Sequence, residues 1–117
     1  MDKRRVVVTG LGAVTPLGNS VSDTWDGIRN ERCGIGPITL FDTTDYAVKI
    51  AGEVKNFSLS DFGIDRKEAR KMSRFTQFAV AAACEAVKDS GFTKESILGC
   101  KSGVVIGNGI GGFETME

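Results

Sequence analysis

The sequence RVVVTGLG at residues 5–12 joins a run of β-branched residues to a glycine-containing loop. Residues 5–9 are rich in valine and are followed directly by glycine, which is typical of a short strand buried on both faces. Gly10 and Gly12 indicate that the backbone turns sharply, or approaches another segment closely, where that strand ends. We therefore expect a buried strand followed by a tight loop.

A short helix is expected over residues 20–30. Ser20 and Asp23 have the spacing of a capping box, with Asp in place of the usual Glu or Gln. Apolar residues then recur at every third or fourth position, which is the spacing of one helix face. This pattern predicts that Trp25 belongs to the core.

A long helix is expected over residues 65–90. Asp65 is a suitable N-cap with Glu68 three positions on, and Gly91 occupies the C′ position after the last turn. The first half is strongly basic and is expected to be exposed. Residues 79–87 are small and apolar on nearly every side, so this half of the helix is expected to be buried on most sides.

The remaining segments complete an alternating pattern. Residues 37–47 are expected to form a loop, residues 47–54 an edge strand or hairpin arm, residues 94–98 a short turn of helix, and residues 102–106 a second buried strand. Phe113 and the residues after it have the pattern of a helix start. The order strand, helix, weak strand, long helix, strand predicts an α/β fold with right-handed crossovers.

The composition excludes several classes of protein. The 117 residues have the size of one domain, and 15 basic residues balance 15 acidic ones. A chain without net charge lacks the basic face that duplex nucleic acids require. No apolar run is long enough for a membrane span, and the start does not resemble a signal peptide. Together with three cysteines, these features lead us to expect reduced thiols and a cytoplasmic location.

The chain contains no histidine, which limits its chemistry. A Ser-His-Asp or Cys-His arrangement, or a histidine-ligated metal site, cannot be built from these residues alone. Cys84 is expected to be a small buried hydrophobic residue, and Cys33 and Cys100 to be free thiols in loops. We therefore expect no catalytic residue and no metal site in this chain.

Two further patterns each allow two interpretations. Gly107-x-Gly109-x-x-Gly112 matches a dinucleotide-binding fingerprint after a strand, but these glycines could equally serve close packing. A cluster of basic residues either forms a solvated helix face or docks an acidic partner. In one continuous helix, four members of the cluster share a face, namely Lys67, Arg70, Lys71 and Arg74, with Arg66 beside them.

Four motifs in this order resemble the condensing enzymes of fatty-acid synthesis, the β-ketoacyl-acyl-carrier-protein synthases, with the bacterial type II enzyme the most similar. The motifs span essentially the whole chain and are RRVVVTGLGAVTPLG at 4–18, FDT with AGEV at 41–43 and 51–54, RKEARKM at 66–72, and GNGIGG at 107–112.

The resemblance implies a thiolase-like fold with two related halves in five α/β/α/β/α layers, and a homodimer. It implies that an acyl group on a cysteine condenses with malonyl on acyl carrier protein, with loss of carbon dioxide. One cysteine and two histidines do this chemistry in the family, and none of the cysteines here matches. We therefore expect residues 1–117 to be an N-terminal, β-α-β-α-β portion of one half, inactive by itself.

Two sets of residues carry over from the family. Ile110 matches an isoleucine of the acyl pocket, with Gly109 and Gly111 beside it. A second set matches the basic residues that dock acyl carrier protein, namely Lys67, Arg70 and Lys71. The family uses no nucleotide or metal cofactor. The alternatives are a Rossmann-type oxidoreductase fragment and a carrier-protein-binding module without catalysis, and an elongating synthase is not separated from a polyketide ketosynthase.

Overall fold

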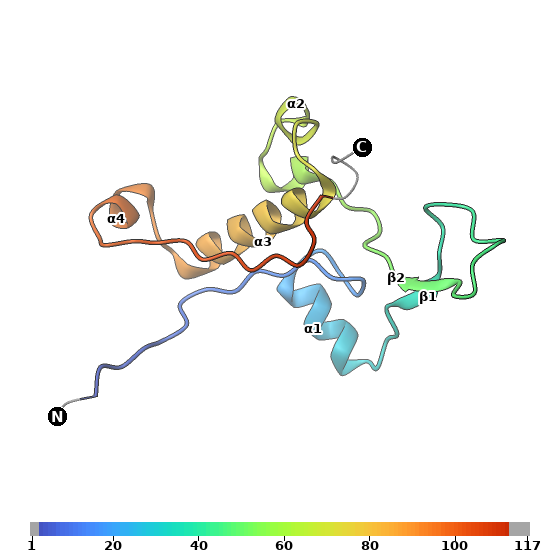
Figure 1. The fold of residues 1–117 in the computed structure, drawn as a ribbon. Coiled ribbons are helices and arrows are strands. Elements are labelled where there is room, and N and C mark those ends of the chain that lie inside the picture. Colours follow the sequence, from blue (N-terminus) through green and yellow to red (C-terminus); the bar gives the residue numbers. More distant parts are fainter. Residues whose placement is uncertain (1–2, 113–117) are drawn as a thin grey trace.

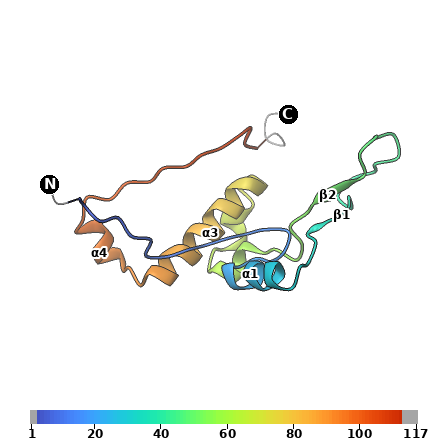
Figure 2. The same cartoon turned by 90° about the horizontal axis from the view of Figure 1, so that it is seen from below.

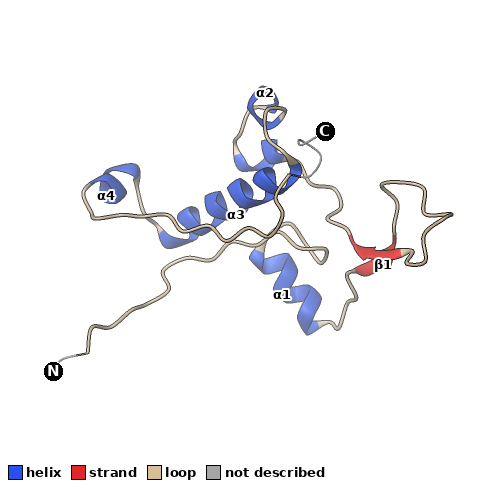
Figure 3. Cartoon of the chain, in the orientation of Figure 1, coloured by secondary structure: helices blue, strands red, loops and turns tan. Residues whose placement is uncertain are grey.

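The computed structural model describes residues 3–112 and contains more helix than strand (Figure 3). In chain order the elements are α1 (Val21–Arg29), β1 (Ile35–Pro37), β2 (Ile50–Gly52), the 3-10 helix η1 (Leu59–Phe62), α2 (Arg66–Ala69), α3 (Arg74–Ser90) and α4 (Lys94–Leu98). The long helix α3 lies at the centre, with α2 near its first turn and α4 beyond its last (Figure 1). The β1–β2 hairpin projects away from the helices.

The arrangement is open. The Cα radius of gyration is 17.4 Å, whereas a compact domain of about 100 residues has about 13 Å. Among the described residues, Leu59 and Ala81 are the buried hydrophobic side chains. Both ends of the chain run as long segments without regular secondary structure (Figure 2).

The two buried strands predicted at residues 5–9 and 102–106 do not form in the described structure, so that prediction is wrong. The side chains of Val6 and Val105 are 91% and 99% exposed. A strand is held by ladder hydrogen bonds and by packing on its faces. The described residues supply neither to these segments, because the one sheet among them consists of β1 and β2. The observed order is therefore one helix, a two-stranded hairpin and then further helices, rather than β-α-β-α-β.

The sequence predicted a strand or hairpin arm for one side of this hairpin, but not for the other. β2 lies within the edge strand or hairpin arm predicted at 47–54, which is confirmed. It pairs antiparallel with β1, whose last residue lay in the predicted loop, and Gly36 faces Ala51. The buried Glu53 carboxylate, just after β2, accepts hydrogen bonds from the Thr39 amide at 2.8 Å and the Thr39 hydroxyl at 2.7 Å. These bonds tie the segment after β1 to the segment after β2.

The predicted helix over 65–90 is two helices. Asp65 is the N-cap of α2, as predicted, and its side chain accepts a hydrogen bond from the Lys67 amide at 2.8 Å. The chain then leaves helical geometry at Ser73, whose extended backbone starts α3. A Ser that takes an extended N-cap conformation interrupts a helix without changing its apolar spacing, so periodicity does not reveal the break. The left-handed cap at Gly91 is confirmed.

The loop at residues 10–13 packs tightly on α3. A Cβ atom at Gly12 would overlap the Ala82 carbonyl oxygen. The Glu85 carboxylate accepts from the backbone amides of Ala13 and Val21, each at 2.9 Å. This supports the close-packing interpretation for the first glycine cluster.

The structure confirms the cap of α1 but not the predicted burial of apolar residues. The Ser20 side chain accepts from the Asp23 amide at 3.1 Å, whereas Trp25 is 57% exposed rather than in the core. In the alanine-rich half of α3, Ala81 is buried but Val87 is exposed and Cys84 is half-buried, so burial on most sides is also not observed. Helical spacing identifies an apolar face, but the covering element must come from elsewhere. No helix within residues 3–112 has the length and apolarity needed to cross a membrane.

Candidate functional site

The basic surface predicted from the sequence is built on α2 and the turn after it. The Asp65 cap starts this helix, and the Lys71 amide continues its turn by donating to the Glu68 carbonyl at 3.0 Å. Lys67, Arg70 and Lys71 are all exposed. We call these three residues the docking surface, after the role that the resemblance predicts for them. The structure places them together, as the spacing predicts.

An acidic residue within α2 pairs with one of these cations. The Lys71 ammonium lies 2.7 Å from a Glu68 carboxylate oxygen in an exposed i,i+3 ion pair. Such exposed pairs contribute little to stability. Within residues 3–112 neither Lys67 nor Arg70 forms an ion pair, so their charges remain available to a partner.

Arg74 does not extend the docking surface, and the prediction that it shares one helix face with the other three is wrong. The break at Ser73 separates it from α2. Its guanidinium lies over two aromatic rings, 5.0 Å from the Phe57 centroid and 4.8 Å from the Phe78 centroid. Arg74 therefore stabilises the junction between η1 and α3 by cation–π contact.

The second predicted site, the loop around Ile110, lies at the same end of α3. Gly111 has a left-handed φ of +80°, and a Cβ placed there would lie 3.6 Å from a ring atom of Phe75 in the first turn of α3. Ile110 is 78% exposed, and among residues 3–112 a Cβ at Gly109 would meet nothing within 4 Å other than its chain neighbours. The acyl-pocket assignment of these residues stays a prediction. The helix start at Phe113 lies outside the described residues.

The three cysteines have no arrangement that suggests catalysis. All are free thiols, with Cys33 and Cys100 exposed and Cys84 half-buried. In the described part of the chain, no group of three or more Cys, Asp or Glu side chains is placed to hold a metal ion.

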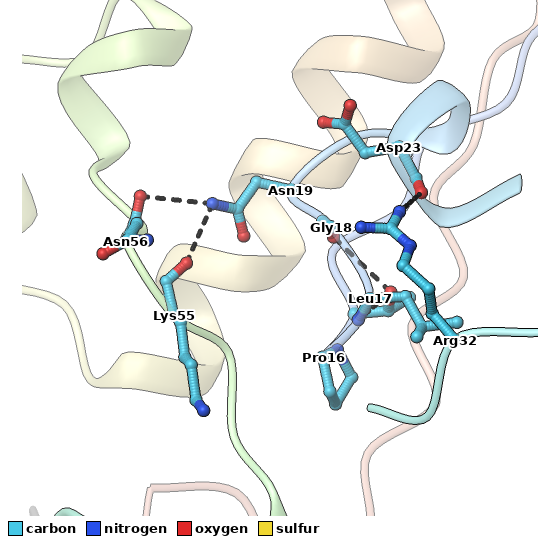
Figure 4. A pocket seen from close by; sticks show the side chains of 9 residues that line it. Pro16, Leu17, Gly18, Asn19, Asp23, Arg32, Lys55 and Asn56 are labelled. Atoms are coloured by element: carbon cyan, nitrogen blue, oxygen red, sulfur yellow. Dashed lines mark hydrogen bonds between the residues drawn. The ribbon is translucent and has the colours of Figure 1, made fainter. Parts of the chain in front are cut away.

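A hollow of about 280 Å³ that the sequence did not predict lies beside the loop before α1 (Figure 4). The Asn19 side chain donates to the carbonyl oxygens of Lys55 and Asn56, at 3.1 and 3.2 Å, and so ties this loop to the segment after β2. The Arg32 guanidinium donates to the Asp23 carbonyl at 3.0 Å and closes the other side. The bonds of Asn19 and Arg32 all end on backbone carbonyls and join separate segments of the chain, which points to a structural role.

Comparison with known proteins places the chain in one family. Residues 3–117 match the family model of the β-ketoacyl synthase N-terminal domain. The chain belongs to the β-ketoacyl synthases.

Two curated relatives show which members of the family the chain is similar to. The chain is 49% identical to 3-oxoacyl-acyl-carrier-protein synthase 2 of Synechocystis sp. over 117 residues, all of this chain and 28% of that protein. It is 51% identical to the synthase 2 of Staphylococcus aureus (strain COL) over 116 residues, 99% of this chain and 28% of that protein. The chain thus spans 28% of the length of these two curated relatives.

A solved structure shows the same fold for most of the chain. The ishigamide ketosynthase/chain length factor superposes with a TM-score of 0.71 and 40% sequence identity, covering 80% of this chain and 23% of that one. The four fifths of the chain that superpose therefore have the arrangement of a segment from a ketosynthase fold.

Proposed function

We propose that the complete protein containing these residues is a 3-oxoacyl-acyl-carrier-protein synthase that elongates fatty acids. The observation that carries this proposal is identity of about 50% along the whole chain with relatives named for that activity. In the proposed reaction an acyl group passes from a carrier thioester to an enzyme cysteine. Malonyl-acyl carrier protein then loses carbon dioxide, and its carbanion attacks the acyl thioester to form the new carbon–carbon bond and release the thiol.

The described residues serve recognition rather than chemistry in this proposal. The docking surface receives the acidic acyl carrier protein, because exposed cations on one helix steer and orient an anionic partner. Ile110, between Gly109 and Gly111, lines the acyl pocket, since an apolar side chain among glycines lets an acyl chain approach the backbone. The catalytic cysteine and two histidines lie outside these 117 residues.

We also infer the architecture of the complete protein. It has the five-layered thiolase-like fold and acts as a cytoplasmic homodimer, without a nucleotide or metal cofactor. The apolar segments 5–9 and 102–106, extended and exposed here, become buried strands of a sheet that the complete protein provides. The likeness to a ketosynthase/chain length factor favours a polyketide ketosynthase as the second candidate.

The activity test uses the complete protein with acyl and malonyl thioesters of acyl carrier protein. We expect carbon dioxide release and a β-ketoacyl product two carbons longer, detected by mass spectrometry. A product that has undergone several condensations without reduction would favour the polyketide candidate. A folded protein that binds NAD(P) and forms no such product would contradict both candidates and restore the oxidoreductase alternative.

A further inference from the structure

A second hollow, shallow and open to solvent and of about 280 Å³, lies between η1 and α2 and borders the docking surface. Its volume exceeds by several times the roughly 30 Å³ that one water molecule occupies in the liquid. Arg70 belongs both to the docking surface and to the wall of this hollow. The hollow is also lined by Phe57, Ser58, Leu59, Ser60 and Arg66.

Two arginines, Arg66 and Arg70, line the hollow. Arg66 and Arg70 are one helical turn apart, and both are exposed. Neither forms an ion pair with any residue from 3 to 112. A guanidinium presents a planar set of donors that matches the two oxygens of a carboxylate. The lining therefore offers guanidinium donors that have no ion-pair partner among residues 3–112.

Two hydroxyl groups at the start of η1, that of its N-cap Ser58 and that of Ser60, add a donor of a different kind. The Ser58 and Ser60 hydroxyl oxygens are 2.6 Å apart and share one hydrogen bond. Each hydroxyl carries one proton, so this bond uses one of the two protons and leaves the other free to donate. The wall of the hollow thus carries a neutral donor near the two cations.

Part of the lining is apolar. Leu59 is 2% exposed, and the Phe57 ring packs edge-on against Phe78 with the ring centroids 5.0 Å apart. A ligand with a short hydrocarbon stem and a terminal carboxylate satisfies both parts of this lining. Aspartate and glutamate side chains have that form.

We propose that this hollow receives an acidic side chain of the docked carrier protein, with Arg66 as a docking residue in addition to the docking surface. The inference rests on the proposed function, because it takes the acidic carrier as the partner. We call this hollow the socket. It adds a defined binding position for one carboxylate to a surface whose cations otherwise attract the partner through long-range charge. Long-range charge gives encounter, whereas a socket with fixed donors gives orientation.

The test measures binding of acyl carrier protein to the complete protein by isothermal titration calorimetry at two salt concentrations. Arg66→Gln is expected to weaken binding roughly tenfold and to reduce its dependence on salt. Replacing Ser58 and Ser60 together by alanine should weaken binding a few-fold with unchanged salt dependence, since no charge is lost. Lys101→Gln removes a distant exposed cation and serves as the charge-matched control.

The occupant is identified by replacing each carrier aspartate and glutamate with its amide in turn. One such carrier variant should weaken binding to the unmodified protein but have no added effect with Arg66→Gln. If Lys67→Gln weakens binding and neither the Arg66 nor the serine variant does, the socket is wrong and the docking surface stands. If Lys67→Gln also has no effect, the proposed docking itself fails.

Discussion

The Lys71 ammonium lies 2.7 Å from the Glu68 carboxylate, on the surface that we propose for the carrier protein. An acidic partner must compete with Glu68 for this cation. Glu68→Gln removes the competitor together with one negative charge. We expect carrier affinity to rise by about two- to threefold, equivalent to about 0.5 kcal/mol, and to fall again as salt screens the charges.

This expectation is checked by titration calorimetry at low and high salt. Asp45→Asn, in the exposed loop between β1 and β2, is the control because it removes the same charge away from α2. Equal gains from both variants would assign the effect to net charge alone. Weaker binding by Glu68→Gln would mean that the pair orients Lys71 for docking.

Glu53 gives the hairpin a pH dependence. Hydrogen bonds from the Thr39 amide and hydroxyl, and from the Leu40 amide, hold the pKa of the Glu53 carboxyl below its ordinary value. A carboxyl whose pKa is lower in the folded state contributes stability above its unfolded pKa, near 4.3, and loses it as the pH falls through the folded pKa. The hairpin arms should therefore separate in acid below about pH 4.

Hydrogen exchange of the Thr39 and Leu40 amides follows this opening directly. We expect their protection to decline as the pH is lowered through this range, after correction for the intrinsic exchange rate. Glu53→Gln should lower their protection at neutral pH and abolish the pH-dependent decline. The amide of Ala81, buried in α3, is the internal reference. A decline that persists in Glu53→Gln would show that another group is responsible.

At the scale of elements, the orientation of α2 depends on one side chain of α3. The Gln77 amide donates to the Ala69 carbonyl at 3.0 Å and to the Met72 carbonyl at 3.1 Å. These carbonyls belong to the end of α2 and the turn after it, where helical bonding stops. Gln77→Met keeps the size and removes both donors, so we expect a loss of about 1–2 kcal/mol and a more mobile α2.

A mobile α2 should also bind carrier protein less tightly. We expect Gln77→Met to accelerate amide exchange in α2 and to raise the KM for carrier-bound substrate with little change in kcat. Ser90→Ala removes a comparable side-chain bond to a carbonyl, that of Val87 at 2.7 Å, at the far end of the same helix. Similar effects on KM from both variants would indicate a general loss of stability instead.

The predictability of each element follows the range of the interactions that form it. The caps at Ser20, Asp65 and Gly91 depend on residues a few positions away, and all three were predicted correctly. The break at Ser73 was missed because the apolar spacing continues across it. The strand at 5–9 was predicted and does not form, because a strand needs partners far away in sequence.

How much of the candidate site could be predicted depends on the range of the interactions in the same way. Spacing and resemblance brought together the three cations of the docking surface, which lie within five residues of each other. They did not reveal that Arg74 turns to the rings of Phe57 and Phe78. Nor did they reveal the hollow between η1 and α2. Its serines lie at the start of η1, whereas its arginines lie on α2 and at its C-cap. The sequence pattern therefore predicted the cations that lie close together along the chain, but not the hollow that residues around two elements form.

At the scale of the whole molecule, the described chain leaves much apolar surface uncovered. Val7, Val8 and Val104 are exposed in the extended segments, as is Trp25 on α1. Monomeric proteins rarely expose apolar patches of more than a few hundred Å². We predict that residues 1–117 alone associate as concentration rises and melt over a broad range, as light scattering and calorimetry would record. A sharp transition of a monomer would contradict this.

Val105 provides the sharpest comparison between the chain alone and the complete protein. Because it is 99% exposed here, Val105→Lys should change the stability of residues 1–117 by less than about 0.5 kcal/mol and reduce their association. If segment 102–106 becomes a buried strand in the complete protein, the same substitution buries an unpaired charge and should cost about 3 kcal/mol or more. Val48→Lys, in the exposed hairpin loop, should be neutral in both. Denaturant unfolding of all the variants measures these differences, and a complete protein that tolerates Val105→Lys would place this segment at its surface.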